Sequence, residues 1–322
     1  MLRRSGSDRA VGPRPEAAGG AATTRRRPDL LLIVIVVAAV IGATVLVYSP
    51  AATWLSDYNQ GLIVDQYQDD VHGADPGAAA QLAEAHRYNA ALSAGALVGA
   101  GEHVPTSDAE AAAGFDYDRI LRTRTGVMSR IQIPSIAVDL PVYHGTDDAT
   151  LLRGAGHLEG TSLPVGGAST HAVITAHRGL ADAVMFTDLD RLREGDRFTV
   201  TTFGEVLTYE VVDITVVAPS DTLALRQEAG RDLVTLVTCT PLGINSHRIL
   251  VTGERVTPTP PASTRAAEAG AEGAGFPWWL LAYVGALLLI GVYAWRSSAS
   301  GARARGGRGD RRAEGYVSHV GA

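Results

Sequence analysis

The chain contains two long uncharged apolar runs, one toward each end. Leu30–Tyr48 has 19 residues, close to the ~20 that a helix needs to cross a bilayer. Trp278–Trp295 has 18 residues with aromatic rings at both ends, where such rings favour the lipid headgroup zone. Both runs predict transmembrane helices. A cleaved signal peptide fits the first run less well because its apolar stretch is too long, and a buried core helix fits the second poorly because an Arg cluster follows it.

From about Gly126 the pattern changes to short β-branched runs that are broken by Gly, Pro and Asp. The predicted strands are Val127–Ile133, Val138–Val142, His171–Thr175, Phe198–Thr202, Leu207–Val217, Leu233–Thr238 and Arg248–Thr252. Such closely spaced strands indicate a mostly β domain, either a barrel or a sandwich. The alternation on both sides of Gly204 predicts a hairpin. Residues 147–153 and 186–193 predict short helices between strands, and the segment after Pro76 predicts an Ala-rich helix to Leu92.

Charge is distributed unevenly along the chain. All 28 basic residues are Arg, and 13 of them lie before Leu30 or from Arg296 onward. Residues 30–295 carry 15 Arg against 29 acidic residues, a net charge of −14, which argues against a nucleic-acid-binding domain. The Arg-rich ends beside the two apolar runs place both termini in the cytoplasm and the middle of the chain outside. Their low-complexity composition predicts disordered tails.

Cys239 is the only cysteine, so an intramolecular disulfide is impossible. It ends one predicted strand, while His177 follows another and Arg248 opens a third. A nucleophilic thiol needs an acid–base partner and an oxyanion donor, which His and Arg would supply. Three alternatives remain open: an inert buried thiol, His171 as the partner because it shares strand parity with His177, and Arg248 as a salt-bridged strand end. No metal-binding or nucleotide-binding motif is present.

These motifs resemble those of the sortase family, in particular its class C, pilin-polymerising group. The resemblance extends from about Tyr88 to Arg255 and is carried by TLVTCTPLGINSHR at 235–248, AVITAHRG at 172–179, LPVYHG at 140–145 and GHLEGTSLPVGG at 156–167. It implies a closed eight-stranded β-barrel with short helices, flanked by two transmembrane helices. It implies no cofactor and no metal.

The resemblance also implies a cysteine transpeptidase mechanism. Cys239 would attack the Thr–Gly bond of an LPXTG-type sorting signal on a surface protein or pilin and form a thioester. His177 would transfer protons, and Arg248 would hold the substrate carbonyl. The acceptor amine would be a pilin lysine, or a peptidoglycan-precursor amine for a wall-anchoring enzyme. The membrane lipid and these proteins are then the expected partners, with no nucleic acid.

Two features depart from the class C pattern. The expected lid region, Gly99–Asp108, lacks the Asp-Pro-aromatic triplet of the group, which puts strict pilin polymerisation in question. Leu242 occupies a position where an aromatic residue is common. Two further functions stay open at this point: an L,D-transpeptidase or thiol hydrolase acting on the wall itself, and a non-catalytic ectodomain that displays or binds a partner.

The predicted domain organisation combines these readings. The boundaries are a cytoplasmic tail at 1–29, a transmembrane helix at 30–48, an N-terminal helical and lid region at 49–125, a catalytic β-barrel at 126–256, a Pro/Ala/Gly-rich linker at 257–277, a second transmembrane helix at 278–295 and a cytoplasmic tail at 296–322.

Overall fold

The computed structural model describes residues 30–98, 114–271 and 274–314. The expected tail at 1–29 and the expected lid region Gly99–Asp108 lie outside the described residues. The chain divides into two compact units. One is Gly42–Ala286, and the other includes the ends of the two long helices, from Leu30 to Ile41 and from Leu287 onward.

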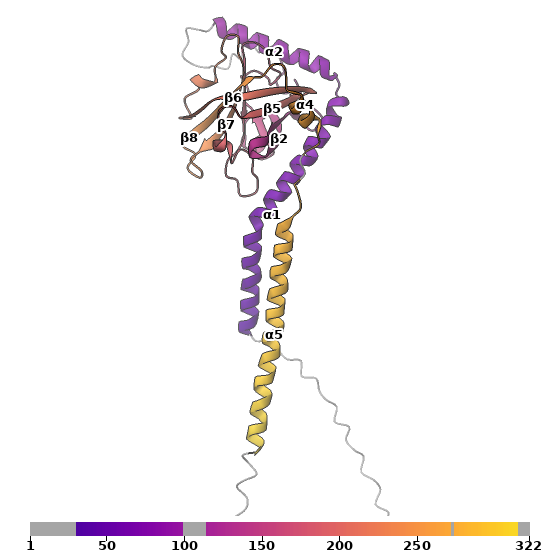
Figure 1. Ribbon diagram of the computed structural model, residues 1–322, viewed down its shortest axis with the longest axis vertical. Coiled ribbons are helices and arrows are strands. Elements are labelled where there is room, and N and C mark those ends of the chain that lie inside the picture. Colours follow the sequence, from indigo (N-terminus) through magenta and orange to yellow (C-terminus); the bar gives the residue numbers. More distant parts are fainter. Residues whose placement is uncertain (1–29, 99–113, 272–273, 315–322) are drawn as a thin grey trace, which may run out of the picture. The chain divides into compact units, whose positions relative to one another are not determined.

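Eight strands close into a barrel, which confirms the predicted fold (Figure 1). Their bounds are β1 Val127–Ile133, β2 Val138–His144, β3 Ala155–His157, β4 Thr170–Thr175, β5 Arg197–Thr202, β6 Glu205–Val217, β7 Asp232–Thr240 and β8 His247–Arg255. Neighbours around the barrel follow the order β1-β2-β3-β4-β7-β8-β6-β5. The β2–β3 and β4–β7 pairs are parallel and the other six are antiparallel. Short helical turns connect several strands: η1 Pro134–Ile136, α3 Asp148–Leu151, η2 Leu189–Arg191 and η3 Leu223–Leu225.

Alternating side chains fill the barrel interior. Ile131, Val200, Leu236 and Val251 are fully buried members of the largest apolar cluster, because every second residue of a strand points to the same face. The β5–β6 hairpin turns at Phe203 and Gly204, whose φ angles are 48° and 90°. Two positive φ values in a two-residue turn match the twist of the flanking strands, so the predicted hairpin is confirmed.

In the part of the chain that the structure describes, two helices precede the barrel. α1 (Leu30–His72) continues well past Tyr48, where the sequence predicts that the apolar helix ends, and α2 (Ala78–Val98) follows it. Tyr67 explains part of this continuation, because its buried hydroxyl donates to the Met128 carbonyl at 3.0 Å and accepts from the Phe203 amide at 2.8 Å. Packing against the barrel therefore stabilises helical turns that have no transmembrane pattern.

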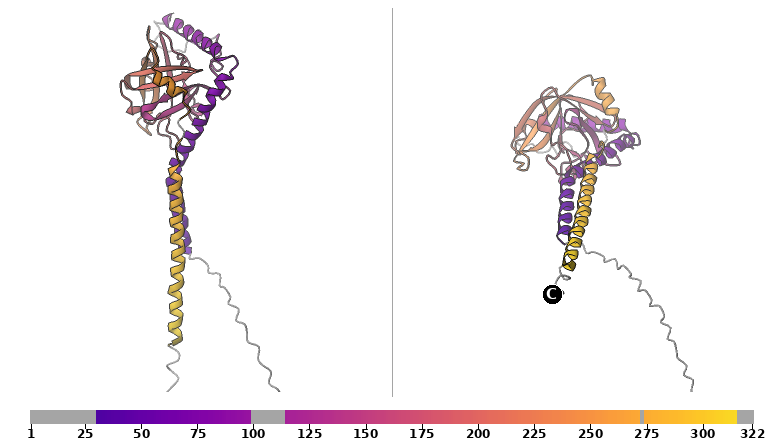
Figure 2. Two further views of the ribbon diagram at one scale, coloured as in Figure 1. Left: turned by 45° about the vertical axis from the view of Figure 1, so that its right-hand side comes forward. Right: turned by 60° about the horizontal axis from the view of Figure 1, so that its bottom comes forward.

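The segment after the barrel is more ordered than its composition predicts. The expected linker at 257–277 contains α4 (Pro261–Glu268), which lies against β5 and β6 (Figure 2). The final helix, α5 (Trp278–Glu314), continues through much of the segment predicted to be a disordered tail. Extending an existing helix costs less than nucleating a new one. Among the described residues, two helical segments, Leu30–His72 and Trp278–Ser298, are long and apolar enough to cross a membrane.

Candidate active site

Cys239 lies at the rim of the barrel, one residue before the end of β7. The six preceding strand residues, Leu233–Thr238, are buried, and Cys239 is the point where partial exposure begins. Because β7 pairs with β4 on one side and β8 on the other, hydrogen bonds fix its backbone from both directions. The thiol is thus partly accessible on a rigid support, which is the arrangement that a nucleophile requires.

Arg248 is the direct cross-strand partner of Cys239 in the antiparallel β7–β8 pair. Directly opposed residues in such a pair point to the same face, with Cβ atoms ~4.5–5.5 Å apart. The Arg248 Nη1 group donates to the carbonyls of Asn245 and His247, both at 3.0 Å. These bonds anchor the guanidinium to the β7–β8 turn. Because one short turn joins β7 to β8, these two paired residues are also close in the sequence.

His177 reaches the same rim through the parallel β4–β7 pair. Each residue of β4 faces the residue 62 positions later in β7, from Thr170 with Asp232 to Thr175 with Val237. The Ala176 amide continues this ladder by donating to the Val237 carbonyl at 3.2 Å. The Thr238 hydroxyl then donates to the Ala176 carbonyl at 2.8 Å. His177 and Cys239 are the next residues of these two segments, directly after Ala176 and Thr238.

Strand parity places Cys239 and Arg248 on the outer face of the barrel. Val237 and Leu250 each lie two residues from one of them, and both belong with Val173 to a small apolar cluster separate from the barrel interior. Residues two apart on a strand share a face. Cys239 and Arg248 are therefore the next outward-facing residues beyond this apolar cluster, at the rim of the barrel.

His171, the alternative partner, lies elsewhere. It pairs with Leu233, six strand residues and roughly 20 Å from the level of Cys239 at ~3.3 Å per residue. Its Nδ1 donates to the Arg226 carbonyl at 2.8 Å, so its Nε2 accepts from the Thr235 hydroxyl at 2.7 Å. Burial lowers the pKa of this imidazole. The ring is a buried part of a hydrogen-bonded network, remote from the thiol.

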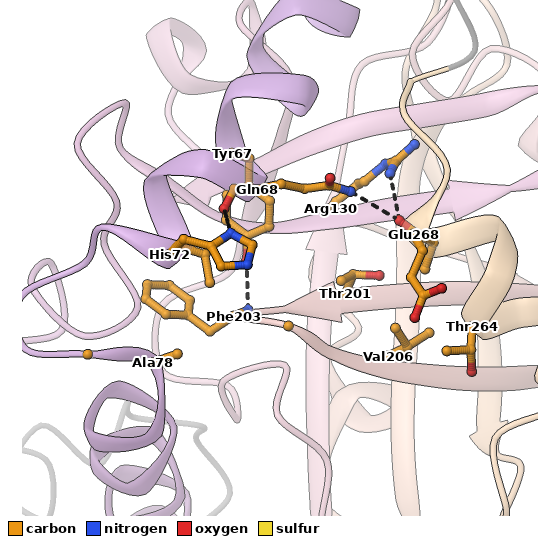
Figure 3. A pocket seen from close by; sticks show the side chains of 14 residues that line it. Tyr67, Gln68, His72, Ala78, Arg130, Thr201, Phe203, Val206, Thr264 and Glu268 are labelled. Atoms are coloured by element: carbon orange, nitrogen blue, oxygen red, sulfur yellow. Dashed lines mark hydrogen bonds between the residues drawn. The ribbon is translucent and has the colours of Figure 1, made fainter.

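A pocket of about 520 Å³ lies away from these residues, where α1, α4 and the β5–β6 turn meet (Figure 3). Its walls include Tyr67, His72 and Glu268, together with Val206 near the start of β6. The other end of β6, at Val217, pairs with Arg248, so roughly 35 Å of extended strand separates the pocket from the Cys239 rim. Across the described ranges, no group of three or more His, Cys, Asp or Glu side chains is arranged to hold a metal ion.

The sequence alone indicates no role for the residues that immediately follow His177 and Cys239. Arg178 and Thr240 occupy these positions, and their side chains hydrogen-bond to each other at 3.1 Å. The sequence offers one indication of a role: each of the two residues directly follows a candidate catalytic residue. Nothing in the local pattern indicated that the two side chains meet across 62 residues of sequence.

The comparisons with known proteins agree on one family. A family model described as a sortase domain matches residues 131–256. The chain is 30% identical over 141 residues to sortase D of Bacillus subtilis, which covers 42% of this chain and 68% of that protein. It is 31% identical over 130 residues to sortase A of Bacillus anthracis, covering 40% of this chain and 60% of that relative.

A solved structure adds a longer match. The crystallised sortase C1 of GBS pilus island 1 is 41% identical to this chain, and the match covers 63% of this chain and 98% of that one. The TM-score is 0.54. The matched share of this chain is therefore larger than the barrel alone.

Proposed function

This chain belongs to the sortase family of cysteine transpeptidases, and on that premise we propose that it cleaves an LPXTG-type sorting signal between Thr and Gly. The cleaved protein would be transferred to an amine. The observation that supports the proposal is the strand register: Cys239 pairs directly with Arg248, and the β4–β7 ladder continues to Ala176, the residue before His177, at the same end of β7.

The proposed reaction has two halves. In the first, His177 takes the thiol proton as the Cys239 Sγ attacks the Thr carbonyl carbon, and the oxyanion of the tetrahedral intermediate is held by N–H groups of Arg248. The C–N bond then breaks while His177 passes this proton to the departing Gly amine, which leaves a thioester on Cys239. In the second, an acceptor amine attacks the thioester and gives its proton to His177, the C–S bond breaks, and His177 returns the proton to the departing Sγ.

The leading proposal for the acceptor is a pilin lysine. It is supported by the similarity to sortase C1 of GBS pilus island 1. A peptidoglycan-precursor amine is the alternative, supported by the similarity to proteins named sortase A. The two acceptors share the same chemistry, a primary amine attacking a thioester, and differ in what surrounds that amine.

The proposed location is the cell membrane, with both apolar helices spanning it, both termini in the cytoplasm and the barrel outside. The two candidate spans and the Arg clusters next to them support this topology through the positive-inside rule. Ser49, at the end of the first apolar run, donates to the Ala181 carbonyl at 2.6 Å, so the segment that follows His177 would lie close to the outer lipid surface.

Mass spectrometry of the full-length protein in detergent micelles tests the proposed chemistry. Incubation with an LPXTG peptide should give an acyl adduct on Cys239 and release the Gly-side fragment. Cys239→Ala should give neither, although it should keep the melting temperature of the wild type. Cleavage by that variant would refute the mechanism, and an unmodified wild-type protein would favour a binding role.

A competition experiment separates the acceptors. Wild-type protein that carries the acyl group is offered a lysine-containing pilin peptide and a peptidoglycan stem peptide at equal concentration. Preferential transfer to the pilin peptide supports pilus assembly, whereas preferential transfer to the stem peptide supports wall anchoring.

A further inference from the structure

Arg178 connects the two strand ends that meet at the proposed active site. We propose that it is a positioning residue, which holds the His177 backbone in register with Cys239 during the reaction. The proposal rests on the proposed function, because it assigns Arg178 a role in that same chemistry.

The guanidinium of Arg178 donates from three nitrogens to three residues in two segments, the β4–β5 connection and the end of β7. Nε donates to the Thr187 carbonyl at 3.0 Å, Nη1 to the Thr240 hydroxyl at 3.1 Å, and Nη2 to Asp190 Oδ2 at 2.6 Å. The side chain is only 8% exposed. Since Thr240 is the residue after Cys239, the Nη1 bond ties the His177 segment directly to the strand end that carries the nucleophile.

Contacts of the neighbouring residues support the same junction. A Cβ added to Gly179 would collide with Leu242 Cδ2, so Leu242 packs directly onto this glycine. Gly179 has a φ of +73°, a conformation that residues with a side chain adopt rarely. Its amide donates to the Thr187 hydroxyl at 3.1 Å, and the Phe186 amide donates to the His177 carbonyl at 3.0 Å. The segment that follows His177 is thus folded back and packed on the segment that follows Cys239.

This tie acts where regular strand pairing ends. The β4–β7 ladder reaches Ala176, and the chain turns away from β7 after His177. Arg178 provides the next cross-link between the two segments. A displacement of about 1 Å between reacting groups can cost roughly 100-fold in rate, so loosening this cross-link should lower turnover.

Arg178 is expected to contribute to the reaction by positioning His177 and not through its own charge. The carboxylate of Asp190 forms an ion pair with the guanidinium, which offsets its positive charge near the thiol. Arg248 has a different environment, since the partners of its Nη1 are two neutral carbonyls. The two arginines therefore differ in role: Arg248 is assigned to the substrate oxyanion and Arg178 to the alignment of His177.

Steady-state kinetics with a fluorogenic LPXTG peptide tests the proposal on the full-length protein in micelles. Arg178→Met removes every donor at similar length and should lower kcat about 10- to 100-fold while KM changes less than about threefold. Arg178→Lys should recover part of this loss, because one ammonium group cannot reach all three acceptors. Arg197→Met is the matched control, since Arg197 pairs with Glu210 on the exposed barrel surface, and it should leave kcat unchanged.

A second readout needs no substrate. The rate at which iodoacetamide alkylates Cys239 is measured against pH in the wild type, in Arg178→Met and in His177→Ala. Arg178→Met should shift the profile toward that of His177→Ala, because a misplaced imidazole influences the thiol less. If the wild type fails to cleave the peptide but the alkylation profile of Arg178→Met still shifts in this way, the proposed function fails and the positioning role stands.

An unchanged kcat together with an unchanged alkylation profile in Arg178→Met would overturn the proposal. If Arg178→Met does not fold, Thr240→Val replaces it, because this change removes a single acceptor of Arg178 and conserves volume. A wild-type kcat and alkylation profile in Thr240→Val would then overturn the proposal equally.

Discussion

Replacing Arg130 by Met should strongly destabilise the barrel and release α4 from it. The Arg130 side chain is almost fully buried and makes a bidentate ion pair with Asp139, with N–O distances of 2.7 and 2.6 Å. It also donates to the carbonyls of Ala267 and Ala269 at 3.1 and 3.0 Å. A single guanidinium thus joins β1 to β2 and to the end of α4.

The expected magnitude follows from what the substitution leaves behind. Met fills a similar volume, but Asp139 keeps a charge at a side chain that is only 17% exposed. Removing one partner of a buried ion pair typically costs about 3–5 kcal/mol. For a unit the size of Gly42–Ala286, each kcal/mol lowers the melting temperature by about 2–4 °C. The variant should therefore melt roughly 6–20 °C below the wild type.

Scanning calorimetry of the full chain in micelles measures this difference, with Arg197→Met as the control. Arg197 is 53% exposed in its pair with Glu210, and such surface pairs contribute about 0–1 kcal/mol. The double variant Arg130→Met/Asp139→Leu removes the stranded carboxylate and should recover at least half of the loss. In limited proteolysis with trypsin, Arg130→Met should be cut faster at Arg265 in α4. A single variant that melts within 2 °C of the wild type would refute the reasoning.

Three further predictions concern histidines and a glycine. His177→Gln should abolish peptide cleavage with little change in melting temperature, whereas His171→Gln should lower the melting temperature and keep activity; the reverse result would contradict the assignment. Burial lowers the pKa of His157 to about 4. The folded state therefore resists a proton that the unfolded chain accepts below about pH 6.5. The free energy of unfolding should be highest above pH 6.5 and should fall by about 3 kcal/mol as the pH drops to 4. Calorimetry across that range should show a flatter pH dependence for His157→Gln, and equal slopes would refute the role of burial. Gly179→Ala should lower kcat at least 10-fold, because the added Cβ would displace Leu242; unchanged kinetics would show that the junction tolerates movement.

Local pattern in the sequence was sufficient for most of the strands. The predicted strand Val127–Ile133 has the bounds of β1, because alternation and β-branching are properties of adjacent residues. β3, at Ala155–His157, was missed because three residues are too few to show alternation. α4 was missed because its Pro-rich composition indicates a linker, whereas the helix is held by Arg130, more than 130 residues earlier.

The candidate site, too, could be predicted only in part from the sequence. The sequence indicated Cys239, His177 and Arg248 as chemical types at strand ends, and the family resemblance gave them roles. It left His171 and His177 equivalent by parity. The β4–β7 register separates the two, since it pairs His171 with Leu233 and ends with Thr175 opposite Val237, two residues before His177 and Cys239 respectively.

The sequence by itself therefore determined most of the strands, the two apolar helices and the reactive residue types. Only the tertiary structure decided which residues meet: the register of a parallel pair, the Arg178–Thr240 bond across 62 residues and the burial of Arg130 against α4. The physical reason is the distance along the chain over which each effect acts. Periodicity and propensity act within a few residues, whereas register and side-chain contacts depend on segments brought together by closing the whole barrel.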